Sequence, residues 1–244
     1  MPEAENAHWP TPLDDEWRMV HARGGKVARV SPLASVRLWV SLGEGVVIHP
    51  FALVGHLPSR MPTLAHLGDP QRWLHIGERT EVGPHTTLYG GLHVGDDTLI
   101  GDGASIRENV RIGNRCIIGR NVTINFGVVI GDDTRIMDGS FIAENTRIGE
   151  GCLLGAGVVT SGDRHPNIRD YKYAGSYAPV IEDSVLVGSG ANILPGVRIG
   201  IGAVVAAGAV VAESVPPRYR AIGPKASVVW VEAPKDKAPV HHPV

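Results

Sequence analysis

The chain has 244 residues, a formal net charge of −2 and 31 glycines, and aromatic residues make up only 5% of it. This length suits one large domain or two small ones, and so few aromatic residues argue against a thick aromatic core. The near-neutral charge provides neither the basic stripe that nucleic acid requires nor a polybasic membrane patch, so we expect neither partner. No uninterrupted apolar run approaches about 18 residues, so no membrane span is expected.

Residues 1–29 read as an N-terminal extension. Its opening, "MPEAENAHWPTPLDDEW", is acidic and lacks the basic-then-apolar order of a signal peptide, so the sequence predicts a cytoplasmic protein. Cys116 and Cys152 fit a reducing compartment, and they serve as small interior residues rather than as a disulfide.

From residue 30 an aliphatic residue recurs at every sixth position, usually followed by glycine, and a small or β-branched residue comes four positions later. The aliphatic positions are Val30, Val36, Leu42, Ile48 and Val54; then Ile76, Val82, Leu88, Val94, Ile100, Ile106, Ile112, Ile118, Ile124, Ile130, Ile136, Ile142, Ile148 and Leu154; then Ile181, Val187, Ile193, Ile199, Val205 and Val211. An α-helix cannot keep a six-residue period on one face, whereas short strands joined by tight turns can. Three sides of six residues make a coil of 18, and these repeats predict roughly eight coils.

Two inserts interrupt the repeat, the first at about residues 57–75 and the second at about 161–180. Because repeats supply a scaffold, function is expected in the inserts and the last coils. The second insert carries Asp163, His165, Tyr171 and Tyr173 among other polar and aromatic residues. We interpret this crowding as an acceptor pocket rather than a spacer.

The residue before each aliphatic points outward, and residues 18 apart lie above one another in successive coils. One outward column then holds His75, His93 and Arg111. Another holds Glu81, Leu99, Ile117, Arg135 and Leu153, and continues through Leu186 and Val204 if the second insert returns the chain to the corner it left. A mostly apolar outward stripe indicates a partner surface.

Over residues 30–217 the repeat resembles the hexapeptide-repeat acyltransferase family. The resemblance implies an all-β fold, a left-handed parallel β-helix, with residues 218–244 forming a C-terminal cap and flexible tail. The family is usually homotrimeric, so the resemblance also implies a homotrimer through the apolar face with Leu99, Ile117 and Leu153.

The stretch "GAGVVTSGDRHPNIRD…YAPVIEDSVLVGSGANILPGVRIG" resembles the branch that includes maltose, galactoside and other sugar-modifying acetyltransferases. In that branch the histidine at the place of His165 is the general base, which removes a proton from the acceptor as it attacks the acetyl-CoA thioester. Asp163, Asp170 and Glu182 are all candidates for orienting the ring. The resemblance favours N-acetylation of an amino sugar or nucleotide-linked amino sugar, with O-acetylation of a sugar or small alcohol as the alternative.

The family lays the pantetheine arm of the donor beside the late coils. The matching positions are Gly188, Ser189 and Gly190, then Ala206 and Ala207, whose small side chains leave the backbone open. A backbone N–H there is the expected donor to the oxyanion. Lys225, in the segment after the last coil, is the candidate contact to the donor's phosphates.

His75 and His93 also resemble the stacked histidines of γ-class carbonic anhydrases, which bind zinc. That class pairs two histidines five residues apart, a spacing missing here, and catalytic zinc needs three protein ligands where only two line up. We therefore expect no metal, and assign His75, His93 and Arg111, with Tyr171 and Tyr173, to an acceptor such as a nucleotide phosphate. A zinc protein and a non-catalytic assembly module remain the alternatives from other classes.

Overall fold

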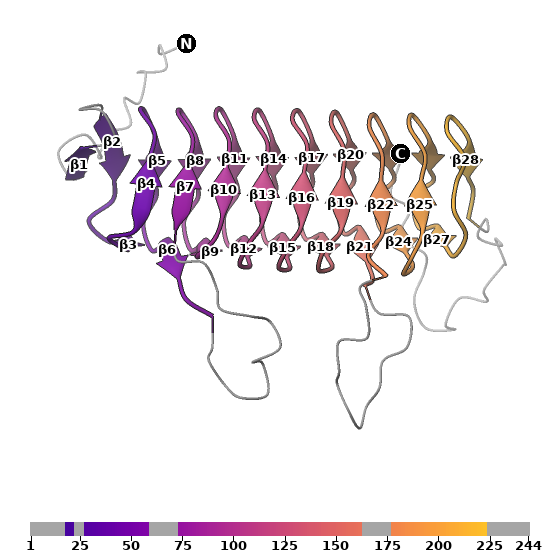
Figure 1. The fold of residues 1–244 in the computed structure, drawn as a ribbon, viewed down its shortest axis with the longest axis horizontal. Coiled ribbons are helices and arrows are strands. Elements are labelled where there is room, and N and C mark those ends of the chain that lie inside the picture. Colours follow the sequence, from indigo (N-terminus) through magenta and orange to yellow (C-terminus); the bar gives the residue numbers. More distant parts are fainter. Residues whose placement is uncertain (1–17, 22–26, 59–72, 163–176, 224–244) are drawn as a thin grey trace, which may run out of the picture.

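The computed structural model describes residues 18–21, 27–58, 73–162 and 177–223. These residues form strands only, wound into a left-handed parallel β-helix whose three sheets run the length of the molecule (Figure 1). The all-β fold predicted from the repeat is confirmed.

Each turn contributes one strand to each of three faces, in the order A, B, C. Face A holds β1 (Arg18–His21), β2 (Val27–Val30), β5 (Val47–Ile48), β8 (Glu81–Val82), β11 (Leu99–Ile100), β14 (Ile117–Ile118), β17 (Arg135–Ile136), β20 (Leu153–Leu154), β23 (Leu186–Val187), β26 (Val204–Val205) and β28 (Arg220–Ala221). Face B holds β3 (Ser35–Val36), β6 (Leu53–His56), β9 (Thr87–Tyr89), β12 (Ser105–Ile106), β15 (Thr123–Ile124), β18 (Phe141–Ile142), β21 (Val159–Thr160), β24 (Asn192–Ile193) and β27 (Val210–Val211). Face C holds β4 (Val40–Leu42), β7 (Leu74–Ile76), β10 (His93–Val94), β13 (Arg111–Ile112), β16 (Val129–Ile130), β19 (Arg147–Ile148), β22 (Val180–Ile181) and β25 (Arg198–Ile199).

The solenoid has about nine turns, close to the roughly eight predicted. Three strands lie outside the aliphatic repeat, of which β1 pairs antiparallel with β2 before the repeat begins. β28 follows the last repeat, and β21 places Thr160 at an aliphatic position. The buried Thr160 hydroxyl accepts a hydrogen bond of 2.7 Å from the Ala143 N–H, which offsets the cost of burying it.

The repeating aliphatic residues fill the interior in columns, as predicted. Residues such as Ile100, Ile118 and Ile136 are fully buried, and strand pairing sets them in register one turn apart. A buried aliphatic side chain of this size contributes about 1.5–3 kcal/mol relative to exposure. Each turn contacts only its neighbours, so stability accumulates along the stack.

Two features of the turns explain the remaining motif positions. The third residue after most of the aliphatics adopts a left-handed backbone, as at Asn109 (φ 59°) and Asn121 (φ 54°), and asparagine tolerates this conformation better than most residues. Close packing between turns requires the glycine after the aliphatic, since a Cβ on Gly77 would lie 2.4 Å from the Gly95 carbonyl carbon in the next turn.

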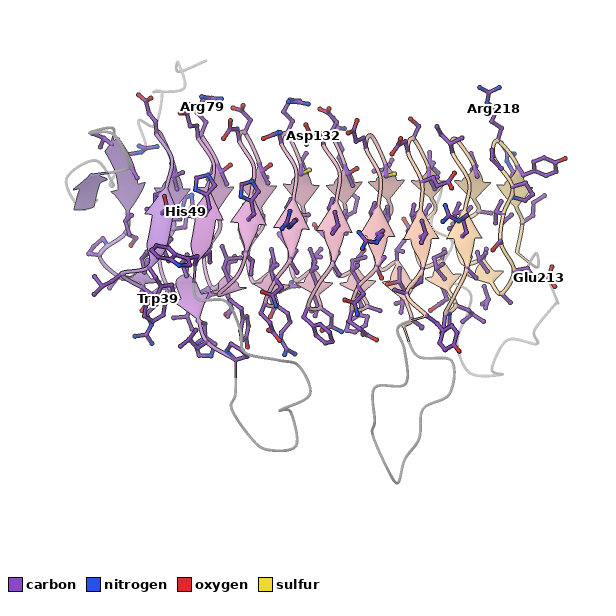
Figure 2. The ribbon with its side chains drawn as sticks, in the orientation of Figure 1. Trp39, His49, Arg79, Asp132, Glu213 and Arg218 are labelled. Carbon is purple, nitrogen blue, oxygen red and sulfur yellow. The ribbon has the colours of Figure 1, made fainter. Side chains whose placement is uncertain are left out.

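The edge between faces C and A (the CA edge) carries polar ladders. Inside it, the hydroxyls of Thr98 and Thr134 accept the N–H groups of Cys116 and Cys152, both free and buried thiols, at 3.1 and 3.0 Å. Outside it, Arg79 donates two hydrogen bonds to Asp97, and Arg115 donates two to Asp133. Figure 2 shows Arg79 and Asp132 along this same edge.

Both inserts leave the solenoid at the edge between faces B and C (the BC edge). β6 ends at His56 before the first, and β21 ends at Thr160 before the second (Figure 1). The chain returns to face C each time, because β7 pairs with β4 and β22 pairs with β19. The apolar column of face A therefore continues through Leu186 and Val204 as predicted.

Candidate functional site

A cleft of about 490 Å³ opens on face C where the first insert rejoins the solenoid. Its lining consists of Ser41, Trp73, Leu74, His75, Gly91, Leu92, His93 and Arg111. Trp73 directly precedes β7 and is 74% exposed, so its indole stands in solvent at the cleft wall. The cleft combines an aromatic surface with basic side chains.

The basic residues of this cleft form the predicted column. His93 pairs in register with His75 on one side and with Arg111 on the other. The two imidazole rings are stacked, with centroids 5.1 Å apart and planes inclined by 22°. Two imidazoles and a guanidinium on one wall are suited to hold an anion, because arginine presents a planar fork to phosphate or carboxylate oxygens.

A second hollow of about 240 Å³ adjoins the cleft at the CA edge and shares His75 with it. Its lining consists of Leu42, Gly43, Glu44, His75, Gly77, Glu78 and Asp96. Asp96 Oδ1 accepts the Glu78 N–H at 2.7 Å, which fixes the carboxylate of Asp96 at this corner. Three acids thus line the wall on the other side of His75.

A third group lies on the BC edge between the two inserts. Glu108 is buried at 2% exposure, and both its oxygens accept hydrogen bonds of 2.8 Å from Arg107. This pairing raises the pKa of the Arg107 guanidinium. Arg107 also lies over the rings of Tyr89 and Phe126, at 5.5 and 6.0 Å from their centroids. Sequence reasoning missed this cluster, because acids are common at the position of Glu108, two residues after the aliphatic, as at Asp96 and Asp132.

Two more histidines sit near the edge between faces A and B (the AB edge). His49 Nε2 lies 2.6 Å from Glu81 Oε1, and His85 stacks on Phe51 with ring centroids 5.0 Å apart. Figure 2 labels His49 in the early turns. Both histidines lie on different faces or edges from the cleft and take no part in it.

The small residues assigned to the donor also lie on the AB edge. Along this edge the outward position carries Asp102, Arg120 and Asp138 in earlier turns, then Ala156, Ser189 and Ala207 in later ones. The following glycines include Gly157 and Gly190, where an added Cβ would meet nothing within 4 Å. The last turns therefore present a strip of bare backbone on this edge.

The strip's amides are partly committed to the solenoid. The N–H groups of Gly188, Gly190 and Ala206 donate to the carbonyls of Val205, Ala156 and Ala221 at 2.8–2.9 Å. Gly188 also has a packing role, because a Cβ there would lie 2.3 Å from the Ala207 nitrogen. The expectation that these three amides are open to an oxyanion is therefore not met, and such a donor must come from another group.

The cleft and the bare strip lie in different turns of one chain. On face C, β22, which lies level with the strip, is four strands beyond β10 in the cleft. At ~4.8 Å per strand this separates them by about 19 Å along the axis. The structure thus brings His75, His93 and Arg111 together, and brings Gly188, Ser189, Gly190, Ala206 and Ala207 together, as two separate groups.

His165, Asp163, Tyr171, Tyr173 and Lys225 lie outside the described residues. Glu182, a candidate for orienting His165, lies at the CA edge, where it accepts hydrogen bonds from Arg198 and from the Ile201 N–H. The Arg198 guanidinium holds the pKa of Glu182 below its usual value. Glu182 is therefore engaged on a different edge from the one where the second insert begins.

Within residues 18–21, 27–58, 73–162 and 177–223, no three His, Cys, Asp or Glu side chains gather in a way that could hold a metal ion. The same residues include no helix long and apolar enough to cross a membrane.

Comparisons with known proteins agree with this architecture. The family described as bacterial transferase hexapeptide (six repeats) matches residues 91–125 and 127–162, and the hexapeptide repeat of succinyl-transferase matches residues 109–143 and 180–213. These segments of the chain thus carry hexapeptide repeats of the kind that both family models describe. The matched segments cover the middle and late turns, including the bare strip.

Among solved structures, this hexapeptide-repeat protein is similar to UDP-N-acetylglucosamine acyltransferase of Francisella novicida, with a TM-score of 0.63 and 23% identity over 79% of this chain and 67% of that one. The corresponding enzyme of Campylobacter jejuni gives a TM-score of 0.50 and 17% identity over 80% of this chain and 71% of that one. At these identities the likeness establishes the fold.

Curated relatives match over shorter stretches. Serine acetyltransferase of Salmonella typhimurium is 41% identical over 70 residues, which is 29% of this chain and 21% of the relative. The 2,3,4,5-tetrahydropyridine-2,6-dicarboxylate N-acetyltransferase of Staphylococcus aureus is 52% identical over 50 residues, which is 20% of this chain and 21% of the relative. The chain thus spans about a fifth of the length of these relatives.

Proposed function

We propose that this protein is a CoA-dependent acyltransferase that acetylates an amino sugar or a nucleotide-linked amino sugar. The observation that carries the proposal is the strip of bare backbone at the AB edge, in the turns where the sequence resembles sugar acetyltransferases. The strip, with Ser189 and Ala207 as its outward residues, suits the extended pantetheine arm of acetyl-CoA. The family match and the acetyltransferase names of the curated relatives support the reaction class.

The proposed chemistry is direct transfer without a covalent enzyme intermediate. The acceptor nitrogen attacks the thioester carbonyl carbon, the carbon–sulfur bond breaks, and CoA leaves as the thiol. His165 takes the proton that the nitrogen loses, and Asp163 orients its ring. A general base of this kind supplies about 10²–10⁴-fold in rate. Tyr171 and Tyr173 contact the acceptor, and Lys225 contacts the donor's phosphates.

The proposal includes a homotrimer built on the apolar column of face A. Leu99, Leu153 and Leu186 point outward there with 42%, 38% and 43% of their surface exposed in the single chain. Arg135 interrupts this column, and a mostly apolar outward column is the expected signature of a subunit interface.

The test is release of free thiol from acetyl-CoA with a panel of nucleotide-linked amino sugars, free amino sugars, sugars and small alcohols. We expect turnover with an amino sugar, and a loss of at least ~10²-fold in His165→Ala. His85→Ala, a histidine stacked on Phe51 away from the cleft, is the matched control and should retain activity. Full activity in His165→Ala would remove that residue from the mechanism, and absence of both turnover and CoA binding would favour the assembly module.

A further inference from the structure

We propose that the two hollows on either side of His75 bind one zwitterionic acceptor, with its phosphate in the basic cleft and its ammonium group in the acidic hollow. This inference rests on the proposed acyl transfer and deepens it, because it selects a phosphate-bearing amine over a free sugar or an alcohol. It also gives the acceptor a direction along the surface of face C.

The basic cleft is suited to the phosphate because one arginine and two histidines line it, and no aspartate or glutamate does. His75, His93 and Arg111 stand in one register column, and the other lining residues are Ser41, Trp73, Leu74, Gly91 and Leu92. A guanidinium–phosphate contact is charge-assisted and among the stronger hydrogen bonds in proteins. Beside it, the exposed Trp73 indole offers a flat surface for a planar ring, which a nucleotide base provides.

The adjoining hollow has the opposite charge. Glu44, Glu78 and Asp96 line it together with His75. Arg79 contacts Glu78 at 3.1 Å but directs its two shortest hydrogen bonds, 2.6 and 2.8 Å, to Asp97. The lining of the hollow is therefore rich in carboxylates, which suits a protonated amine.

His75 lies in the wall of both hollows, so a ligand that fills both must pass over its ring. An amino sugar linked to a phosphate carries both charges, and in UDP-glucosamine the ammonium group on C2 lies next to the phosphate-bearing C1, which suits two adjoining hollows. An O-acetyl acceptor lacks the ammonium group and would leave the acidic hollow without a partner. The paired hollows thus favour N-acylation over O-acylation.

The experiment measures binding by calorimetry without any acyl donor, using the full-length protein. The probes are UDP-glucosamine, UDP-N-acetylglucosamine and free glucosamine, so that phosphate and ammonium are removed one at a time. We expect UDP-glucosamine to bind about 10-fold or more tightly than either of the others, since each lacks one charged contact. Equal affinity for UDP-glucosamine and UDP-N-acetylglucosamine, or no binding of either, would overturn the proposal.

Four variants test where the phosphate and the ammonium group of the ligand bind. Arg111→Gln should weaken both UDP ligands by about 10-fold or more, whereas Arg147→Gln, two strands further along the same face, should leave both unchanged. Asp96→Asn should weaken UDP-glucosamine alone, and Asp132→Asn, two turns away on the same edge, should not. Asparagine can still accept the Glu78 N–H, so the corner is kept. If Arg147→Gln weakens binding as much as Arg111→Gln, or Asp132→Asn as much as Asp96→Asn, the effect of charge is general. That result would contradict the assigned site.

Binding and turnover fail independently. If UDP-glucosamine binds with the expected dependence on Arg111 and Asp96 but no thiol is released, the acceptor site is supported and the proposed acyl transfer is contradicted. If acetyl transfer to an amino sugar occurs while the two UDP ligands bind alike, the transferase activity is supported and this acceptor site is contradicted.

Discussion

At the scale of single residues, the Arg107–Glu108 ion pair on the BC edge is expected to make the stability of the fold sensitive to the loss of one charge. Glu108 is almost fully buried, and its two hydrogen bonds come from one guanidinium that also covers Tyr89. Glu108→Gln keeps the shape but removes the charge and one acceptor, leaving Arg107 half-buried without its counter-ion. We expect the free energy of unfolding to fall by roughly 1.5–3 kcal/mol.

Urea unfolding of the wild type and Glu108→Gln measures this loss. Glu144→Gln is the matched control, because Glu144 occupies the same corner two turns further on and is only half-buried. It should change stability by much less. An equal loss in both variants would show that the corner position, rather than the ion pair, sets the stability.

Single residues also show which parts of the candidate site could be predicted from the sequence. His75, His93 and Arg111 were predicted to share a column because no insert lies between them, and a fixed spacing of 18 then sets the register. Ser41 and Glu44 could not be assigned to the same region, because the first insert separates them from β7 and hides the pairing of Ser41 with His75. Glu108 was missed for a different reason, since burial of an acid depends on the partner that neutralises it.

At the scale of elements, the Arg–Asp pairs along the CA edge predict a response to acid. Hydrogen bonds from Arg79 and Arg115 hold the pKa values of Asp97 and Asp133 below their usual values. A carboxylate with a lowered pKa in the folded state adds stability above its unfolded pKa, about 3.9, and this contribution is lost as the pH falls through the folded value. The ladder should therefore stabilise the fold at pH 7 and contribute nothing in strong acid.

Thermal unfolding of the wild type and Arg115→Gln, each measured at pH 7 and in strong acid, tests this. The melting temperature of the variant should be the lower one at pH 7, and the difference should shrink in strong acid or in high salt, since exposed pairs are screened. Arg147→Gln, which lies on face C away from this ladder, is the control and should show no such pH dependence. A difference that is equal at both pH values would assign the effect of Arg115 to packing of its side chain.

Element geometry also explains why β21 lies outside the predicted repeat. The repeat is defined by aliphatic residues, so a strand whose inward residue is Thr160 gives no signal at the border of the second insert. The Ala143 N–H in the preceding turn donates a hydrogen bond to this hydroxyl, and a sequence pattern does not report such a contact. The strands from β2 to β27 other than β21 follow from the pattern because each interior position of a solenoid has the same surroundings.

At the scale of the whole molecule, the apolar column of face A predicts how chains associate. Replacing Leu153 with Glu places a charge in the middle of the column, between Arg135 and Leu186. If face A forms the threefold interface, burying this added carboxylate three times per trimer is costly even beside Arg135, because the desolvation penalty can exceed the gain from pairing, and Leu153→Glu should sediment as a monomer while keeping its β-sheet circular dichroism. Phe141→Glu is the matched control, because Phe141 is exposed to nearly the same extent, 39% against 38%, but lies on face B. It should stay trimeric. A monomeric wild type, or dissociation by Phe141→Glu alone, would remove face A from the assembly.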